Sequence, residues 1–230
     1  TLVFFKGCPL RCKWCANPEG LERKYQIMLR PTSCVGCGAC VPACPQGLHS
    51  ISDTGEHLID RTKDCIGCGA CVEACNYSAL KVAGEYATIS ELLDYVEEDR
   101  AFYEQSGGGV TLGGGEVTAQ PKAAESLLMA CKQNGIHTAI ETCGYTKKET
   151  ILRIAEYVDL FLFDIKNINS DRHYELTGVR NEIILENLKA LLQNKKNVKI
   201  RMPLLKGIND SEEEIRGTID FLMPFKNYRN

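Results

Sequence analysis

Cysteine is the residue type in this chain whose number and spacing could support chemistry. The sequence has 230 residues, of which 13 are cysteine, four are histidine and one is tryptophan. An odd number of cysteines excludes complete internal disulfide pairing, and their close spacing is typical of metal ligation in a reducing compartment. We therefore expect metal centres in a cytoplasmic protein. Eleven cysteines form three groups: Cys8, Cys12 and Cys15; Cys34, Cys37, Cys40 and Cys44; and Cys65, Cys68, Cys71 and Cys75.

The second and third groups repeat each other. Residues 34–44 read CVGCGACVPAC and residues 65–75 read CIGCGACVEAC, a period of 31 with nine of eleven positions identical. Each copy resembles the C-x2-C-x2-C-x3-C run of bacterial ferredoxins, with Pro45 after the first copy and Asn76 after the second. Two structural zinc sites are the alternative. Zinc usually takes two C-x2-C pairs separated by a longer loop, so this spacing would leave ligands over.

The ferredoxin resemblance implies two [4Fe-4S] clusters with exchanged ligands. In that arrangement the first three cysteines of a run bind one cluster, and the fourth binds the other. We expect this ferredoxin-like domain over residues 31–83, inserted into a larger domain formed by residues 1–30 and 84–230. The implied ligand sets are Cys34, Cys37, Cys40 and Cys75 for one cluster, and Cys65, Cys68, Cys71 and Cys44 for the other.

The first group of cysteines is a different kind of site. Cys8, Cys12 and Cys15 have C-x3-C-x2-C spacing, and no fourth cysteine or histidine lies nearby in the sequence. A zinc site would need a fourth ligand or a water, and no HExxH-type partner is present. A [4Fe-4S] cluster with one iron not bound by protein could instead chelate a small molecule. The segment resembles the cluster loop of radical S-adenosylmethionine (SAM) enzymes, in which an aromatic residue, here Trp14, precedes the last cysteine.

A glycine-rich run indicates which family of radical SAM enzymes the chain resembles. Residues 106–116, SGGGVTLGGGE, resemble the segment of radical SAM proteins that binds the amino group of SAM, with Glu116 facing the ammonium. A phosphate loop is the alternative, but no G-K-[ST] follows, and Thr118 stands where G-x-G-x-x-G requires glycine. Together with the cysteine groups and Asp164-Ile165-Lys166, this run is similar to the activating enzymes of glycyl radical enzymes, in the branch that carries a ferredoxin-like insert.

Alternating strand-like and helix-like segments must position these residues. The alternation predicts an α/β fold with parallel strands, and the resemblance implies a partial (β/α)6 barrel. A sixth strand, and a late histidine that contacts SAM, are expected beyond residue 230, and further residues are expected before Thr1. Ser90 is expected to begin the first long helix. Predicted strands span 1–5, 109–113, 137–142, 160–166 and 197–203; predicted helices span 88–105, 121–134, 147–157, 181–195 and 211–223.

Polar residues follow the predicted strands where active sites of parallel α/β folds gather. The resemblance implies that Cys8, Cys12, Cys15 and Lys166 are catalytic. It also implies a monovalent cation near Glu141, Thr142 and Asp164. For each charged residue taken singly, the alternative is a side chain exposed to solvent at a strand end, with no role in binding. The implied SAM contacts are Trp14, Cys15, Ala16, Gly114, Gly115, Glu116, Glu141, Thr142, Asp164, Ile165, Lys166 and Arg201.

Other histidines and cysteines receive no catalytic role from the sequence. We expect His49 and His57 to be exposed polar positions. His137 and His173 are expected to be structural. Cys131 falls on the apolar side of a predicted helix and is expected to be a core thiol, and Cys143 has no partner pattern of a nucleophile.

Composition limits the partners. A net charge of −3 and an isoelectric point near 5.9 indicate no nucleic-acid surface. No apolar run approaches the ~20 residues that span a bilayer, so we expect no membrane association. We expect a monomer.

The resemblance implies a function for these cofactors. An external flavodoxin or ferredoxin would reduce three [4Fe-4S] clusters, and reductive cleavage of SAM would give a radical that takes a hydrogen from a backbone glycine of a glycyl radical enzyme. The alternatives are an electron-transfer polyferredoxin and a radical SAM peptide-modifying or sulfatase-maturing enzyme.

Overall fold

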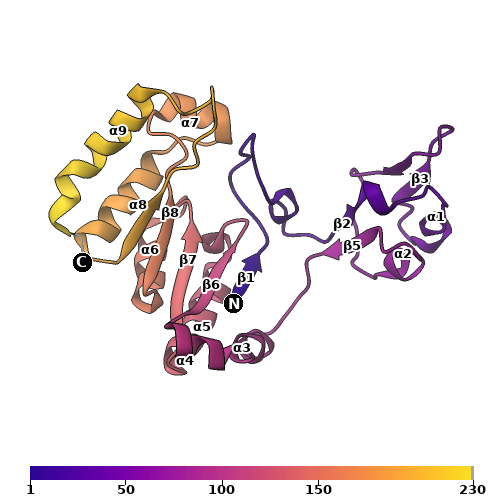
Figure 1. Ribbon diagram of the computed structural model, residues 1–230, viewed down its shortest axis with the longest axis horizontal. Helices are drawn as coiled ribbons and strands as arrows, with labels where there is room; N and C mark the ends of the chain where they lie inside the picture. Colours follow the sequence, from indigo (N-terminus) through magenta and orange to yellow (C-terminus); the bar gives the residue numbers. More distant parts are fainter. Residues whose placement is uncertain (229–230) are drawn as a thin grey trace. The chain divides into compact units, whose positions relative to one another are not determined.

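The computed structural model describes residues 1–228 and divides the chain into two compact units (Figure 1). The first unit comprises Thr1–Leu21 and the chain from Ala87 onward, and the second comprises Glu22–Tyr86. Among residues 1–228, none of the helices combines the length and the hydrophobicity that a bilayer span requires.

A five-stranded sheet forms the centre of the first unit, in the order β1-β6-β7-β8-β9, and each neighbouring pair is parallel. The predicted α/β architecture with a parallel sheet is therefore confirmed. Each strand lies within about two residues of its predicted position. The strands are β1 (Leu2–Phe5), β6 (Gly109–Gly114), β7 (His137–Thr142), β8 (Leu160–Asp164) and β9 (Val198–Arg201).

The helices differ from the predictions at two places. The segment predicted as one helix over 88–105 forms two helices, because the backbone at Asp99 (φ −94°, ψ 9°) leaves the helical range. Its first helix is capped by Thr88 in a capping box with Glu91, not by Ser90. A helix over Ser170–Thr177 was not predicted. The helices of this unit are α3 (Ile89–Glu97), α4 (Arg100–Ser106), α5 (Pro121–Gln133), α6 (Lys148–Ile154), α7 (Ser170–Thr177), α8 (Glu182–Gln193) and α9 (Glu212–Leu222).

The two faces of the sheet carry different side chains because strand residues alternate in direction. On one face, Val3, Ile140 and Phe163 are buried in a core to which α3, α5, α6 and α8 contribute. On the other face, Leu2 and Phe4 of β1 remain 42% and 57% exposed. Glu141, Asp164 and Arg201 share that second face, so the sheet alone brings three charged residues together.

The second unit is built from two short helices and two antiparallel strand pairs. β2 (Gln26–Leu29) pairs with β5 (Leu80–Ala83), and β3 (His49–Ile51) pairs with β4 (His57–Ile59). The helices α1 (Cys40–Ala43) and α2 (Ala70–Glu73) each carry a cysteine on their buried side. This unit extends beyond the predicted 31–83 at both ends, because β2 supplies the partner strand of β5.

Candidate active site and cysteine pockets

The Cys8–Cys15 loop follows β1 and is anchored by backbone hydrogen bonds. Arg11 N donates to Thr177 O at 2.7 Å, and Lys13 N donates to Leu176 O at 3.0 Å. Both acceptors lie at the end of α7, the helix that the sequence did not reveal. The loop is therefore held on the first unit by an element outside every motif.

The three thiols of this loop lie close enough to influence one another electrostatically. Burial raises the pKa of Cys8 to about 11 and also raises the pKa of Cys12. Cys15 is half-buried. Ligation requires thiolates, so a cationic centre must offset this cost. Three sulfur donors on one loop fit an iron-sulfur cluster, because soft thiolates favour such clusters and no hard oxygen donor belongs to the loop.

The glycine run packs directly against the backbone that flanks the cysteine loop. Gly115 N donates to Phe5 O at 2.8 Å. A Cβ on Gly115 would lie 2.4 Å from Gly20 O and 2.5 Å from Gly7 O, distances that no side chain tolerates. Gly114 has φ +108°, a conformation that favours glycine. These glycines therefore let the cysteine loop approach the end of β6, and their contact with SAM stays a prediction.

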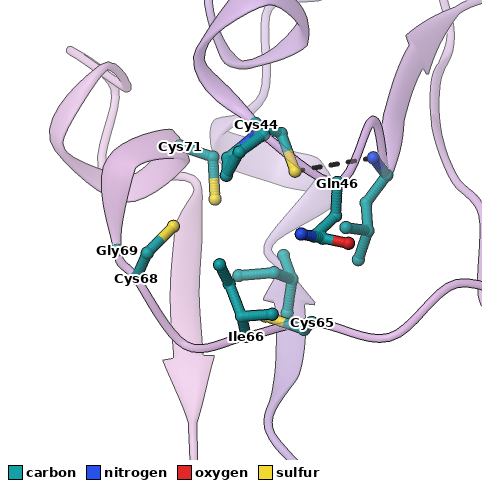
Figure 2. A pocket seen from close by; sticks show the side chains of 10 residues that line it. Cys44, Gln46, Cys65, Ile66, Cys68, Gly69 and Cys71 are labelled. Carbon is teal, nitrogen blue, oxygen red and sulfur yellow. Dashed lines mark hydrogen bonds between the residues drawn. The ribbon is translucent and has the colours of Figure 1, made fainter.

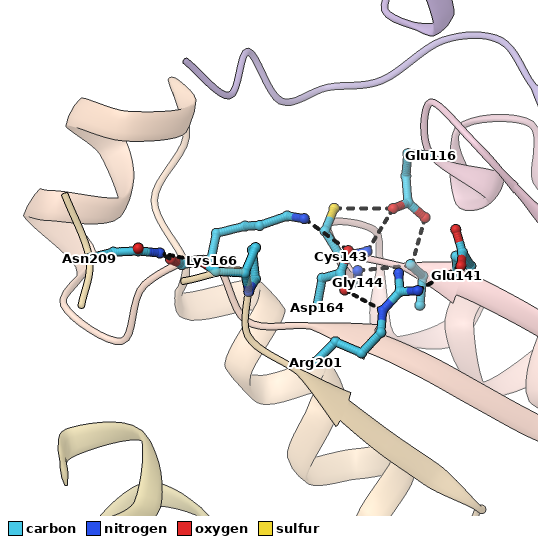
Figure 3. A network of polar contacts seen from close by, with 10 residues as sticks. Glu116, Glu141, Cys143, Gly144, Asp164, Lys166, Arg201 and Asn209 are labelled. Carbon is cyan, nitrogen blue, oxygen red and sulfur yellow. Dashed lines mark hydrogen bonds and ion pairs between the residues drawn. The ribbon is translucent and has the colours of Figure 1, made fainter. Parts of the chain in front are cut away.

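Glu116 is 2% exposed and joins the ends of β6 and β7 (Figure 3). One carboxylate oxygen accepts from Thr118 N at 3.0 Å and from the hydroxyls of Thr118 and Thr142, each at 2.7 Å. The other oxygen accepts from Cys143 N at 2.9 Å and from Cys143 Sγ at 3.1 Å. Five internal donors thus surround the carboxylate that we predicted to face an ammonium. The contact with an ammonium stays a prediction, whereas the hydrogen bonds of Glu116 join the end of β6 to the end of β7.

A second polar network crosses three strands on the exposed face of the sheet (Figure 3). Arg201 Nε donates to Asp164 at 2.7 Å, and its Nη1 donates to Glu141 at 2.6 Å. Lys166 Nζ lies 2.8 Å from the other oxygen of Asp164. Burial opposes the charge of Lys166, but Asp164 outweighs it and raises the pKa of Lys166. The charges of Lys166 and Asp164 both act on Cys12, so this network lies beside the cysteine loop.

Three further predicted residues have distinct surroundings. Trp14 is half-buried in the loop, and Ala16 is exposed. The side chain of Ile165 is 1% exposed in the core, and its N–H donates to Arg201 O at 2.9 Å, so any contact with a small molecule would use its backbone. Arg201 lies between the carboxylates of Glu141 and Asp164, and the predicted monovalent cation beside them stays a prediction.

Buried asparagines hold the loops at this end of the sheet, and no sequence pattern predicted them. Asn209 is fully buried, and its amide donates to Lys166 O at 3.1 Å and to Pro203 O at 2.7 Å. Asn187 donates to Gly144 O at 2.8 Å. A lone asparagine in a helix or turn has no distinguishing spacing.

Cys131 lies on α5, and its thiol is buried in the hydrophobic core, as predicted.

The second unit contains two pockets, each lined by four cysteines. One, of about 320 Å³, includes the first three cysteines of the first run together with the last cysteine of the second. The other, of about 280 Å³, has the complementary set (Figure 2). Each grouping matches the exchanged ligand sets, and sulfur-only donors fit [4Fe-4S] clusters. The sets are Cys34, Cys37, Cys40 and Cys75, and Cys44, Cys65, Cys68 and Cys71.

Two histidines lie against the first of these pockets, which corrects the prediction that both are exposed. His49 is 4% exposed and His57 is 9% exposed. His57 Nδ1 lies 3.6 Å from Cys34 Sγ, and its Nε2 lies 3.6 Å from Cys40 Sγ. Both histidines belong to the β3–β4 hairpin, which the sequence did not reveal, and its pairing turns them inward.

The parallel sheet, the three-cysteine loop and the paired cysteine pockets define the class of protein. The chain matches the radical SAM superfamily over residues 65–222 and a 4Fe-4S dicluster domain over residues 33–80. It belongs to the radical SAM superfamily and binds iron-sulfur clusters and SAM. The crystal structure of Streptococcus suis SuiB bound to SAM has the same fold, with a TM-score of 0.52 at 23% identity over 63% of this chain and 33% of that one.

Closer relatives identify the particular family. The choline trimethylamine-lyase activating enzyme of Oleidesulfovibrio alaskensis is 64% identical over 100% of this chain and 74% of its own length. The trans-4-hydroxy-L-proline dehydratase activating enzyme of Clostridioides difficile is 46% identical over 97% of this chain and 74% of its own length. The chain belongs to the activating enzymes of glycyl radical enzymes, which act on partner proteins. This membership decides against a polyferredoxin and against a peptide-modifying enzyme.

Proposed function

We propose that Cys8, Cys12 and Cys15 hold a [4Fe-4S] cluster at which SAM binds, and that residues 22–86 form the inserted domain with two more clusters. The observation that carries this proposal is the position of the three-cysteine loop beside the Lys166–Asp164–Arg201–Glu141 network. When bound, the cluster supplies the electron that breaks the C5'–S bond of SAM, and the resulting radical takes a hydrogen from a glycine of the partner.

The residues of the chain bind and orient the small molecule in this proposal. SAM carries an ammonium, a carboxylate and a sulfonium. Lys166 and Arg201 offer cationic donors to the carboxylate, and Glu141 and Asp164 keep those donors fixed by direct ion pairs. Glu116 holds the ends of β6 and β7 together, so that the backbone of Gly114 and Gly115 lies at a constant distance from the cysteine loop.

We further propose that the partner is a choline trimethylamine-lyase, in a monomeric, cytoplasmic enzyme reduced by a flavodoxin or ferredoxin. Supporting the choice of partner, the identity to the activating enzyme of that lyase (64%) exceeds the identity to the hydroxyproline dehydratase activating enzyme (46%). The four cysteines in each insert pocket support a relay role, because a cluster with four protein ligands has no iron left for SAM.

Anaerobic reconstitution tests the proposal. We expect about 12 Fe per chain, and release of 5'-deoxyadenosine after addition of dithionite and SAM. Choline trimethylamine-lyase should then develop a glycyl radical doublet in its EPR spectrum, faster than trans-4-hydroxy-L-proline dehydratase does under the same conditions. An iron content near 4 per chain would contradict the three-cluster proposal. A faster reaction with the dehydratase would contradict the proposed partner.

A further inference from the structure

We infer that the buried His49–His57 pair donates a hydrogen bond to Cys34 Sγ and makes the cluster of Cys34, Cys37, Cys40 and Cys75 the more easily reduced of the two in the insert. The inference rests on the ligand sets proposed above. It assigns a positioning and tuning role to two histidines that lie outside every cysteine motif.

The contacts of the pair are directional. His57 Nδ1 lies 3.6 Å from Cys34 Sγ, while His57 Nε2 lies 2.9 Å from His49 Nδ1 and 3.6 Å from Cys40 Sγ. His49 Nε2 is buried and has no hydrogen-bond partner among the described residues. Cys40, His49 and His57 also have donor atoms within 4.8 Å of one another. Cys40 belongs to the four-cysteine pocket, however, so it is not available to a separate metal site.

Counting protons on the two rings selects one arrangement. Both rings are buried, and each ring in its neutral form carries one N–H. If His57 Nε2 donated to His49, His57 Nδ1 would turn a lone pair toward Cys34 Sγ, and His49 would bury an N–H without an acceptor. If His49 Nδ1 donates to His57 instead, His57 Nδ1–H points to the Cys34 sulfur. A ligating thiolate only accepts hydrogen bonds, so it favours the second arrangement.

The two pockets share one equivalent backbone donor and differ at the first cysteine of each run: Cys65 Sγ accepts from Gly67 N at 3.4 Å, whereas Cys34 Sγ has His57 Nδ1 at 3.6 Å. Leu48 N donates to Cys44 Sγ at 3.5 Å, and Ala79 N donates to Cys75 Sγ at 3.4 Å. These two bonds are equivalent in the repeat, and the exchanged ligand sets give one to each pocket. The residues that line the pocket of Cys44 include Gln46, Leu48 and Ile66 but no histidine (Figure 2).

A hydrogen bond to a ligating sulfur changes the reduction potential of the cluster. Adding one electron makes a cluster more negative, and an N–H donor to a ligating sulfur stabilises that added charge. The bond from His49 polarises the His57 ring, so its N–H stabilises the added charge more than the amide N–H of Gly67 does at Cys65, and the cluster beside His57 should have the higher reduction potential. An electron that enters the insert from an external reductant would reside mainly on that cluster.

The test uses the full chain with Cys8→Ala, Cys12→Ala and Cys15→Ala, so that the insert clusters alone give EPR signals. The protein is labelled with nitrogen-15 histidine, reconstituted anaerobically and titrated with dithionite. The first cluster to be reduced should show hyperfine coupling to histidine nitrogen. His57→Phe should abolish this coupling and lower the midpoint potential of that cluster, shifting the electron distribution at least tenfold, about 59 mV for one electron.

Two variants separate tuning from structure. His57→Asn places an amide N–H near the original Nδ1 and should restore most of the potential. His137→Phe, at an exposed position on β7, should leave both midpoints unchanged. Full loading, about 8 Fe, with no nitrogen coupling on the first reduced cluster overturns this inference alone, and so does an unchanged potential in His57→Phe. Loading well below about 8 Fe in the parent variant overturns the proposed ligand sets and this inference with them. If His57→Phe does not assemble, the nitrogen coupling of the parent decides.

Discussion

The three-cysteine loop and the two four-cysteine pockets use the same donor atom in opposite surroundings. The loop lies beside Asp164 and Lys166, whose charges act on Cys12, and its neighbouring strand ends carry two polar networks. Among the residues that line the two insert pockets, none is charged. Under the proposed function, this difference distinguishes a site that binds a charged small molecule from two sites that only hold a cluster. Three cysteines in the loop against four in each pocket already suggest that the loop leaves one iron without a protein ligand. The charges beside the loop explain how a charged small molecule could bind there.

Removal of one loop cysteine should have the largest effect. Cys12→Ala leaves two ligands on the loop, and we expect loss of detectable 5'-deoxyadenosine release together with a fall from about 12 to about 8 Fe per chain. Cys131→Ala is the matched control, because Cys131 is a core thiol away from the motifs, and it should retain both iron and activity. Reductive cleavage of SAM that survives in Cys12→Ala would remove the distinction between loop and pockets.

Pairs of insert substitutions test the exchanged ligand sets by iron content. Cys44 and Cys65 line the same pocket, so Cys44→Ala with Cys65→Ala should cost about 4 Fe per chain. Cys44 and Cys34 line different pockets, so Cys44→Ala with Cys34→Ala should cost about 8 Fe. The reverse result would mean that each run binds its own cluster. A colorimetric iron assay on reconstituted protein distinguishes the two.

The sequence predicted most of the sheet and all of the cysteine groupings, because both depend on local spacing. Strand positions followed from short apolar runs, and the cysteines that share each insert pocket followed from the resemblance of the repeated motif to bacterial ferredoxins. The charged residues at the strand ends were also predicted, since carboxyl ends of parallel strands meet at one edge. Arg201 donates to both Glu141 and Asp164, and these pairs depend on the order of the strands in the sheet, which the sequence does not reveal.

The elements that the sequence missed are those held by contacts distant in the chain. α7 is short and polar, and its role is to accept hydrogen bonds from Arg11 and Lys13. His57 was predicted to be exposed because its three-residue strand, β4, has no periodic pattern long enough to detect. Glu116 was predicted to contact SAM, but its burial and its five internal donors were not, because those donors come from residues two to 27 positions away.

Neutralising Glu116 should weaken the charged surroundings of the loop without removing any ligand. A glutamine cannot accept from all five donors, and its own NH2 must face one of them, so Glu116→Gln should lower the free energy of unfolding by about 2 kcal/mol. Urea denaturation of the apoprotein measures this value. Glu104→Gln, at an exposed position on α4, should change it by less than about 0.5 kcal/mol. Equal effects in the two variants would show that the Glu116 network contributes no stability.

The smallest predicted effect concerns the network on the exposed face of the sheet. Arg201 donates from Nε to Asp164 and from Nη1 to Glu141, two carboxylates on different strands. Lysine has one ammonium and no planar fork, so Arg201→Lys should keep the positive charge but lose one of the two bonds. We expect the Kd for SAM to rise about tenfold, about 1.4 kcal/mol, with iron content unchanged. Anaerobic calorimetry on the reconstituted protein measures it.

Arg216→Lys provides the comparison for that measurement. Arg216 pairs with Glu212 on α9, and both side chains are largely exposed, 73% and 79%. Exposed pairs of this kind contribute little, so this variant should bind SAM as the parent does. If Arg201→Lys also binds SAM normally, the network holds the strands together and does not recognise the small molecule. The loop would then differ from the insert pockets in its number of ligands and in the charge near its sulfurs, but not through Arg201.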